Sequence, residues 1–180
     1  MKLKVFATIL TVFLFSLNLY SQNETLDKKR GFKSFVIGDK KTKYNNNLTF
    51  YKTTEQGYNG YLFIPQNTDD LLVFDSRFTS IYLYFDKNDN LVTINLIKTY
   101  DKDSYSAALD ELKLIIANLT VFFGPQSEKI NYDDKTSTVG AGWAGRDIML
   151  ICVNKYYGYK TGSNNEILIT NYVKAIKEGF

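Results

Sequence analysis

Aromatic side chains gathered in one short segment are the residues best suited to binding a ligand. The segment NKYYGYKTGSNN, residues 154–165, places Tyr156, Tyr157 and Tyr159 around a glycine, and Trp143 lies shortly before it. Tyrosine combines a large contact area and a low entropic cost with a hydroxyl group for polar pairing. These four side chains are our candidate contact surface for a sugar ring or a protein partner. The favoured alternative is a plain connection between two strands, because the glycines and the Ser-Asn-Asn run are typical turn residues.

The residue types that most enzymes use are scarce in this chain. It contains no histidine and a single cysteine, Cys152. Histidine-based triads, histidine proton shuttles and histidine-ligated zinc are therefore excluded. Cys152 lies inside an apolar run, where a thiol usually acts as a small buried hydrophobic residue. We therefore predict no catalytic residue, no metal site and no cofactor.

Two short motifs are similar to ligand-binding loops but lack the context that such loops need. GAGWAG, residues 140–145, has the dinucleotide-binding spacing, but that loop must lead from a strand into a helix N-terminus, and here a strand follows. We interpret it as a flexible turn with Trp143 packed on the sheet. DKNDN, residues 86–90, begins like a calcium loop, but Leu91 and Ile97 stand where glycine and glutamate are required. Hairpin turn chemistry explains this segment.

Paired carboxylates are the remaining route to catalysis without histidine. Asp69 and Asp70 are neighbours, as are Asp133 and Asp134, but neighbours on a turn usually point apart into water. Glycoside hydrolysis needs two acids that converge at roughly 5 to 10 Å. A carboxylate-dependent glycan hydrolase or a carbohydrate-binding module is therefore the alternative hypothesis, and the balance favours a protein that is not an enzyme.

The first residues have the features of a secretory signal peptide. Lys2 and Lys4 precede an apolar run over residues 5–19, and Ser21 supplies a small residue at its exit. The run is interrupted by polar residues and is shorter than the roughly 20 apolar residues that a membrane span needs. We predict a signal peptide over residues 1–21, cleaved after Ser21. The product would be periplasmic or secreted and would have no membrane span.

The charge balance argues against nucleic acid as a partner. The chain has 22 basic and 19 acidic residues, and without the two lysines of the signal the balance is 20 to 19, a net charge of +1. Nucleic-acid affinity comes mainly from positive side chains that neutralise phosphates. The partner that we expect is therefore an unidentified protein or polymer of the cell envelope.

The patterns predict a single α+β domain over residues 31–180, preceded by a disordered lead-in over residues 22–30. The strongest helix covers about 104–123, where apolar residues recur three and four positions apart. Its apolar stripe must pack on the face of an antiparallel sheet. Residues 148–153 are apolar at both alternating sets of positions, which indicates a central strand covered on two faces.

Residues 81–96 predict a β-hairpin with a defined register. Apolar residues alternate with tyrosine, threonine and asparagine on both sides of a polar loop over residues 87–90. If both apolar sets face one core, the predicted pairs are Ile81 with Leu96, Leu83 with Ile94, and Phe85 with Val92.

The N-terminal half gives weaker patterns. Residues 39–48 predict a short helix capped by Asp39, and residues 59–70 predict an edge strand that Pro65 stops. Each half of the domain then has the order of a helix followed by strands. This order suggests a degenerate internal repeat.

The order of these segments resembles that of small exported bacterial proteins of unknown function. The similarity covers the signal peptide, GFKSFVIG, YLYFDKNDNLVTINL, the helix ending in FFGP, and GWAGRDIMLIC. More distantly, the helix-then-strands pattern resembles beta-lactamase-inhibitor-like domains and the SmpA-like domains of outer-membrane lipoproteins. These resemblances imply an α+β fold and carry over no catalytic residue. The chain lacks the lipid-accepting cysteine of SmpA-like lipoproteins.

Overall fold

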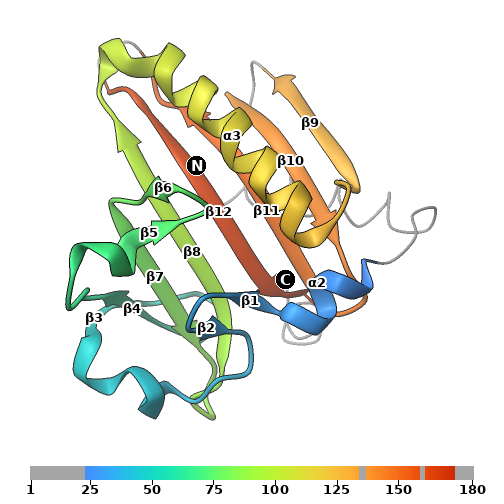
Figure 1. The fold of residues 1–180 in the computed structure, drawn as a ribbon. Helices are drawn as coiled ribbons and strands as arrows, with labels where there is room; N and C mark the ends of the chain where they lie inside the picture. Colours follow the sequence, from blue (N-terminus) through green and yellow to red (C-terminus); the bar gives the residue numbers. More distant parts are fainter. Residues whose placement is uncertain (1–22, 134–136, 159–160, 173–180) are drawn as a thin grey trace.

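The computed structural model describes residues 23–133, 137–158 and 161–172. Its largest element is an antiparallel sheet of eight strands (Figure 1). In their order across the sheet the strands are β3 (Leu48–Thr53), β4 (Asn59–Phe63), β7 (Ser80–Phe85), β8 (Leu91–Tyr100), β12 (Ser163–Asn171), β11 (Ile148–Tyr156), β10 (Thr138–Ala144) and β9 (Glu128–Asp133). Two four-stranded meanders therefore meet at their last strands, β8 and β12.

The shorter elements and the long helix lie together on one face of this sheet. They are α2 (Glu24–Lys29), β1 (Gly31–Phe32), β2 (Phe35–Val36), η1 (Lys41–Asn47), η2 (Thr68–Leu71), β5 (Leu72–Val73), β6 (Ser76–Arg77), η3 (Lys102–Ser104) and α3 (Tyr105–Phe123). Figure 1 shows α3 lying across β10, β11 and β12, with the β1–β2 and β5–β6 hairpins over the neighbouring strands. We call this side of the sheet the helix face and the other side the opposite face. The predicted α+β architecture is confirmed.

The register of the strands assigns every side chain of the sheet to one face. Residues that pair directly across neighbouring strands point to the same side, and successive residues alternate. One row on the helix face is Tyr61, Leu83, Ile94, Ile169, Leu150 and Trp143. The adjoining row on the opposite face is Thr49, Leu62, Tyr82, Asn95, Leu168 and Ile151. Tyrosine and asparagine side chains thus lie on the face of the sheet that points away from the main core.

The helix α3 forms where its periodicity predicts it. Its buried residues are Ala108, Leu112, Ile115, Leu119 and Phe123, which recur at the three- and four-residue spacing of one helix face. Gly124 ends the helix with a φ of 89°, and its N–H donates to the carbonyl oxygen of Thr120. A positive φ of this kind is readily adopted by glycine. Within the described ranges no helix has both the length and the apolar composition to cross a bilayer.

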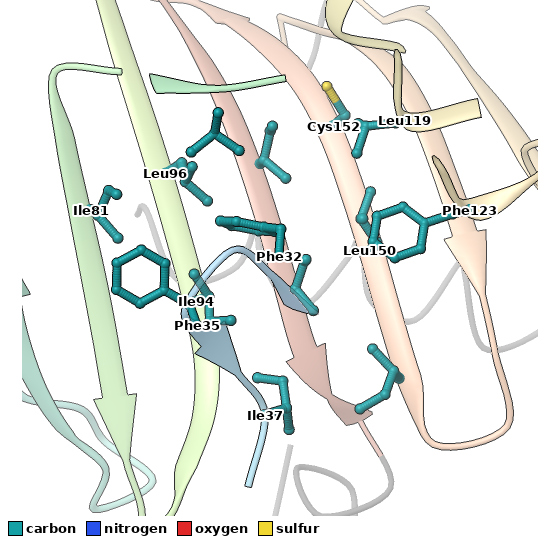
Figure 2. Close-up of a cluster of buried hydrophobic side chains, with 14 of the residues drawn as sticks. Phe32, Phe35, Ile37, Ile81, Ile94, Leu96, Leu119, Phe123, Leu150 and Cys152 are labelled. Carbon is teal, nitrogen blue, oxygen red and sulfur yellow. The ribbon is translucent and has the colours of Figure 1, made fainter. Parts of the chain in front are cut away.

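The core lies between the sheet and the elements on the helix face. Figure 2 shows Phe32 and Phe35 of the β1–β2 hairpin beside Ile94 and Leu96 of β8. The strand β11 has buried residues at every position from Ile148 to Asn154, so the prediction of a central strand covered on both faces is confirmed.

The β7–β8 hairpin has the predicted register except next to its turn. Ile81 pairs with Leu96 and Leu83 with Ile94, but Phe85 pairs with Leu91 and not with Val92. The reason is the buried carboxylate of Asp86, which accepts hydrogen bonds from the backbone N–H groups of Asn88 and Asn90. This capped turn shifts the register by one residue between Tyr84 and Phe85.

Two predictions for the N-terminal half are wrong. β4 is not an edge strand, because β3 pairs with its outer side. Within residues 39–48 the structure has the 3-10 helix η1 (Lys41–Asn47), which Asp39 does not cap. The Asp39 carboxylate instead accepts a hydrogen bond from the Tyr44 hydroxyl at an O···O distance of 2.5 Å. Consecutive asparagines favour such local alternatives over a regular α-helix.

The structure also corrects the prediction of a disordered lead-in over residues 22–30. Its residues Glu24–Lys29 form α2, which the side chain of Asn23 caps. Leu26 is fully buried in the main core. The carboxylate of Asp27 accepts hydrogen bonds from the backbone N–H groups of residues 146–148, in the turn between β10 and β11. One apolar residue and one acid thus dock a segment that otherwise looks polar.

Candidate functional site

The aromatic segment over residues 154–165 divides between the two faces of the sheet. It connects β11 to β12 as an antiparallel hairpin, so the favoured interpretation as a strand connection is confirmed. Tyr156 lies on the helix face, where its ring centroid is 4.8 Å from that of Tyr105. Tyr157 lies on the opposite face, with its hydroxyl 3.3 Å from a carboxylate oxygen of Glu166. Tyr159 lies outside the described residues.

Trp143 does not belong to any exposed surface. It lies in β10, so the interpretation of residues 140–145 as a flexible turn is wrong. Its side chain is fully buried in the main core, and its Nε1–H donates to the carbonyl oxygen of Gly124 at an N···O distance of 2.9 Å. Trp143, Tyr156 and Tyr157 therefore do not form one contact surface.

The opposite face instead brings together three other tyrosines, Tyr51, Tyr82 and Tyr84, which we call the tyrosine patch. Tyr82 and Tyr84 alternate with core residues along β7. Tyr51 joins them from the edge strand β3, where a register shift between Phe50 and Lys52 marks a bulge. The ring centroids of Tyr51 and Tyr82 are 4.9 Å apart, with the ring planes inclined by 49°. Both rings remain partly exposed.

A missing side chain makes room for the third ring of the patch. Gly60 of β4 pairs with Tyr84 of β7, and a Cβ atom at position 60 would lie 2.7 Å from Cε1 of Tyr84. The Tyr84 ring therefore lies over the glycine. Burial raises the pKa of Tyr84 to about 12, with further contributions from Tyr51, Tyr82 and Glu166. Its hydroxyl consequently stays protonated at physiological pH and is able to donate or accept a hydrogen bond.

Asn95 adds an unused acceptor beside the patch. It pairs directly with Tyr82, on the same face. Its Oδ1 atom is buried and has no hydrogen-bond partner among the described residues. A buried amide oxygen without a partner is uncommon in native proteins. A ligand hydroxyl or a water molecule would satisfy it.

A second polar group lies on the opposite face near the β11–β12 turn. Lys155 and Glu166 form an ion pair with an N···O distance of 2.5 Å, and the hydroxyl of Tyr157 approaches the same carboxylate. Burial, followed by the charge of Glu166, raises the pKa of Tyr157 to about 12. The three side chains of this group contact one another, and Tyr157 is half exposed.

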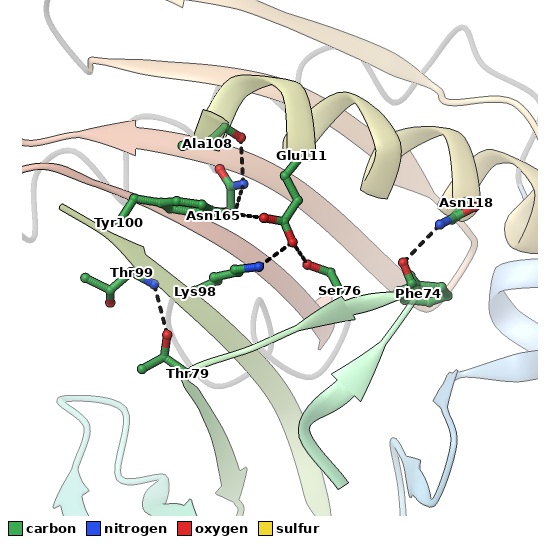
Figure 3. A network of polar contacts seen from close by, with 10 residues as sticks. All are labelled: Phe74, Ser76, Thr79, Lys98, Thr99, Tyr100, Ala108, Glu111, Asn118 and Asn165. Carbon is green, nitrogen blue, oxygen red and sulfur yellow. Dashed lines mark hydrogen bonds and ion pairs between the residues drawn. The ribbon is translucent and has the colours of Figure 1, made fainter. Parts of the chain in front are cut away.

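The densest polar cluster of the described chain lies on the helix face, under the first half of α3 (Figure 3). The Glu111 carboxylate accepts hydrogen bonds from Ser76, from Lys98 at 2.5 Å and from Tyr100 at 2.6 Å. Asn165 donates to both the Tyr100 hydroxyl and the Ala108 carbonyl oxygen. The cluster thereby ties α3 to β6, β8 and β12. Because each of these contacts joins two elements of the fold, we assign the cluster a structural role.

The electrostatics of Glu111 agree with this role. Burial alone would raise the pKa of its carboxyl group, but hydrogen bonds from Lys98, Ser76 and Tyr100 outweigh burial and hold the pKa below the usual value. The carboxylate therefore stays charged and paired at neutral pH. A general acid would need the opposite shift.

The remaining candidates for chemistry are occupied or inert. Asp70 accepts hydrogen bonds from the N–H groups of Gln66 and Asn67, and Asp69 lies 3.6 Å from Arg77. Cys152 is fully buried, and burial raises the pKa of its thiol. In the part of the chain that the structure describes, no three acidic or cysteine side chains converge as metal ligands would. Asp134 lies outside that part.

Comparison of the chain with protein-family models, with curated proteins and with solved structures gave no match. The resemblances to exported bacterial proteins and to beta-lactamase-inhibitor-like or SmpA-like domains therefore remain expectations. The geometry of the chain itself is what supports a functional proposal.

Proposed function

We propose that this protein is an exported, non-catalytic domain that binds a protein or polymer of the cell envelope through the opposite face of its sheet. The observation that carries the proposal is the tyrosine patch. Three phenol rings from two separate segments meet on one face of the sheet, where they remain partly exposed. Large aromatic side chains with a polar end are characteristic of recognition surfaces.

A buried acceptor without a partner beside the tyrosine patch supports this choice of surface. On the helix face the side chains of the Glu111 cluster are bonded to one another, but Oδ1 of Asn154 and Oγ of Ser163 also lack partners among the described residues. On the opposite face the amide oxygen of Asn95 has no partner among the described residues. Unpaired polar groups beside exposed aromatic rings are the arrangement that a ligand completes.

The non-catalytic part of the proposal rests on the chemistry of the side chains. The chain has no histidine, and its single thiol is buried. The carboxylates of Asp70 and Glu111 are already used as acceptors within the fold. Export is proposed from the signal-like residues 1–21, which lie outside the described residues.

Two tyrosine pairs of nearly equal geometry give a matched test. The rings of Tyr51 and Tyr82 on the opposite face are 4.9 Å apart at 49°, and those of Tyr105 and Tyr156 on the helix face are 4.8 Å apart at 50°. We expect the retention of the double variant Tyr51→Ala/Tyr82→Ala on washed envelope material to be lower than that of the unaltered protein by about tenfold or more. A change of this size is typical of the loss of a binding hot spot. The double variant Tyr105→Ala/Tyr156→Ala should be retained like the unaltered protein.

Retention would be measured by co-sedimentation, with circular dichroism to show that both variants are folded. Equal retention of the unaltered protein and the Tyr51→Ala/Tyr82→Ala variant would refute the proposal. So would an equal loss in both double variants, since that result would place the contact elsewhere or nowhere.

A further inference from the structure

We propose that the ligand of the tyrosine patch is a glycan chain, one sugar ring of which stacks on the Tyr51–Tyr82 pair while a sugar hydroxyl donates to Oδ1 of Asn95. This inference rests on the proposed function and names its ligand class. It follows from the size of the aromatic surface, from the groups that border it and from the kind of hydrogen bond that is missing.

The size of the patch fits a sugar ring better than a protein surface. Among the residues that the structure describes only three rings meet there, and the row through Tyr82 passes from Leu62 to the polar Asn95 within one strand on either side. Stable protein interfaces bury about 1,200–2,000 Å² in total around an apolar centre. A small aromatic platform with polar neighbours instead matches a pyranose ring, which has an apolar C–H face and a rim of hydroxyl groups.

The borders of the patch supply the polar part of such a site. Thr93 of β8, which pairs with Tyr84, is already bonded to Thr170, with an O···O distance of 2.8 Å. Asn95 is the next residue of β8 on this face, and its Oδ1 atom lacks a partner. An amide oxygen needs a donor, and a sugar is rich in hydroxyl donors. The unpaired acceptor thus lies next to the stacking surface, but it is closed to solvent in the structure, so a sugar hydroxyl reaches it only when the Asn95 side chain turns outward.

The charge state of the patch agrees with a hydroxyl-rich ligand. The Tyr84 hydroxyl keeps its proton at physiological pH. The amino group of Lys52 lies 5.3 Å from the centre of the Tyr51 ring, so the one cation described against the patch is already engaged with an aromatic face. Recognition here is therefore by stacking and neutral hydrogen bonds. Such contacts do not require an anionic ligand.

The test uses the purified protein and envelope material treated in two ways. Sodium periodate cleaves the vicinal diols of glycans, whereas proteinase digestion removes proteins. For a glycan whose sugars carry vicinal diols, we expect periodate to abolish the retention that depends on Tyr51 and Tyr82; for any glycan, we expect proteinase to leave this retention intact. The variant Asn95→Leu, which keeps the size of the side chain but removes the acceptor, should weaken retention by roughly fivefold to tenfold, as the loss of one hydrogen bond would.

The possible outcomes distinguish a failure of the glycan assignment from a failure of the proposed binding function. Retention that survives periodate but not proteinase would overturn the glycan assignment and leave a binding function for a protein partner. Unchanged retention of Asn95→Leu would remove Asn95 from the site and overturn the stated geometry. If untreated envelope shows no retention that depends on Tyr51 and Tyr82, the proposed function fails as well.

Discussion

Replacing Leu26 with alanine should lower the free energy of unfolding by about 2–5 kcal/mol, the range measured for fully buried leucines. Leu26 is 0% exposed and belongs to the main core, although it lies in a polar segment at the start of the described chain. The loss includes both the transfer of its methyl groups and the cavity left beneath α2. Urea denaturation followed by circular dichroism would measure it.

Leu114→Ala is the matched control, because Leu114 lies on the outer side of α3 and is 66% exposed. Its substitution should change the free energy of unfolding by less than about 0.5 kcal/mol. If Leu26→Ala were as mild as Leu114→Ala, α2 would not be docked on the sheet, and the lead-in would behave as its composition suggests.

The second large effect is expected from Glu111→Gln. Three donors converge on the Glu111 carboxylate, and hydrogen bonds to a charged group contribute about 1.5–3 kcal/mol each to stability when they are well formed. Glutamine keeps the shape but loses the charge, and it presents an NH₂ group to one of the donors. We therefore expect the variant to be less stable than the unaltered protein by about 1–3 kcal/mol at pH 7.

This loss should depend on pH in a defined direction. The pKa of Glu111 is lowered by folding from its usual value of 4.5, so its stabilisation is complete above that value and disappears as the pH falls through the folded pKa. The stability difference between the unaltered protein and Glu111→Gln should therefore be largest at pH 7 and shrink toward pH 3. Urea midpoints at the two pH values would show this.

The control for this effect is Glu24→Gln, because Glu24 forms only an exposed ion pair with Lys28. Exposed pairs of this kind contribute little, so the Glu24 variant should have nearly the same urea midpoint as the unaltered protein at both pH values. A Glu111→Gln penalty that is equal at pH 7 and pH 3 would contradict the charged, hydrogen-bonded state assigned to Glu111.

Local periodicity predicted the elements whose partners are close in sequence. The α3 stripe and the pairs Ile81–Leu96 and Leu83–Ile94 follow from spacing alone, because one apolar face must meet one core. The register fails at Phe85, where the side chain of Asp86 reorganises the turn. Such a side-chain cap changes the number of loop residues without altering the hydrophobic pattern.

The features that the sequence did not predict depend on contacts between segments that are far apart in the chain. Residues 140–145 look like a turn because they are rich in glycine, but the structure uses one of these glycines for close strand packing. A Cβ atom at Gly140 would lie 2.1 Å from the carbonyl oxygen of Cys152. Trp143 then fills the core beside the end of α3. Likewise, the burial of Leu26 depends on a sheet formed far along the chain.

The candidate site could be predicted only in part. The alternation of Tyr82 and Tyr84 with core residues already places both on one face, and the same rule places Tyr156 and Tyr157 on opposite faces. Tyr51 joins the patch through a bulge in β3, which no sequence pattern indicates. Proximity in the sequence therefore pointed to tyrosines that the fold places on different faces, whereas strand order brings together the group on which the proposal rests.

An NMR titration of the protein, labelled on its tyrosine rings, with solubilised envelope glycan would show whether the tyrosine patch is the binding surface. We expect the ring signals of Tyr51, Tyr82 and Tyr84 to shift as ligand is added, while those of Tyr105 and Tyr156 stay in place. Shifts confined to Tyr105 and Tyr156, or no shift in any tyrosine of the patch, would contradict this expectation.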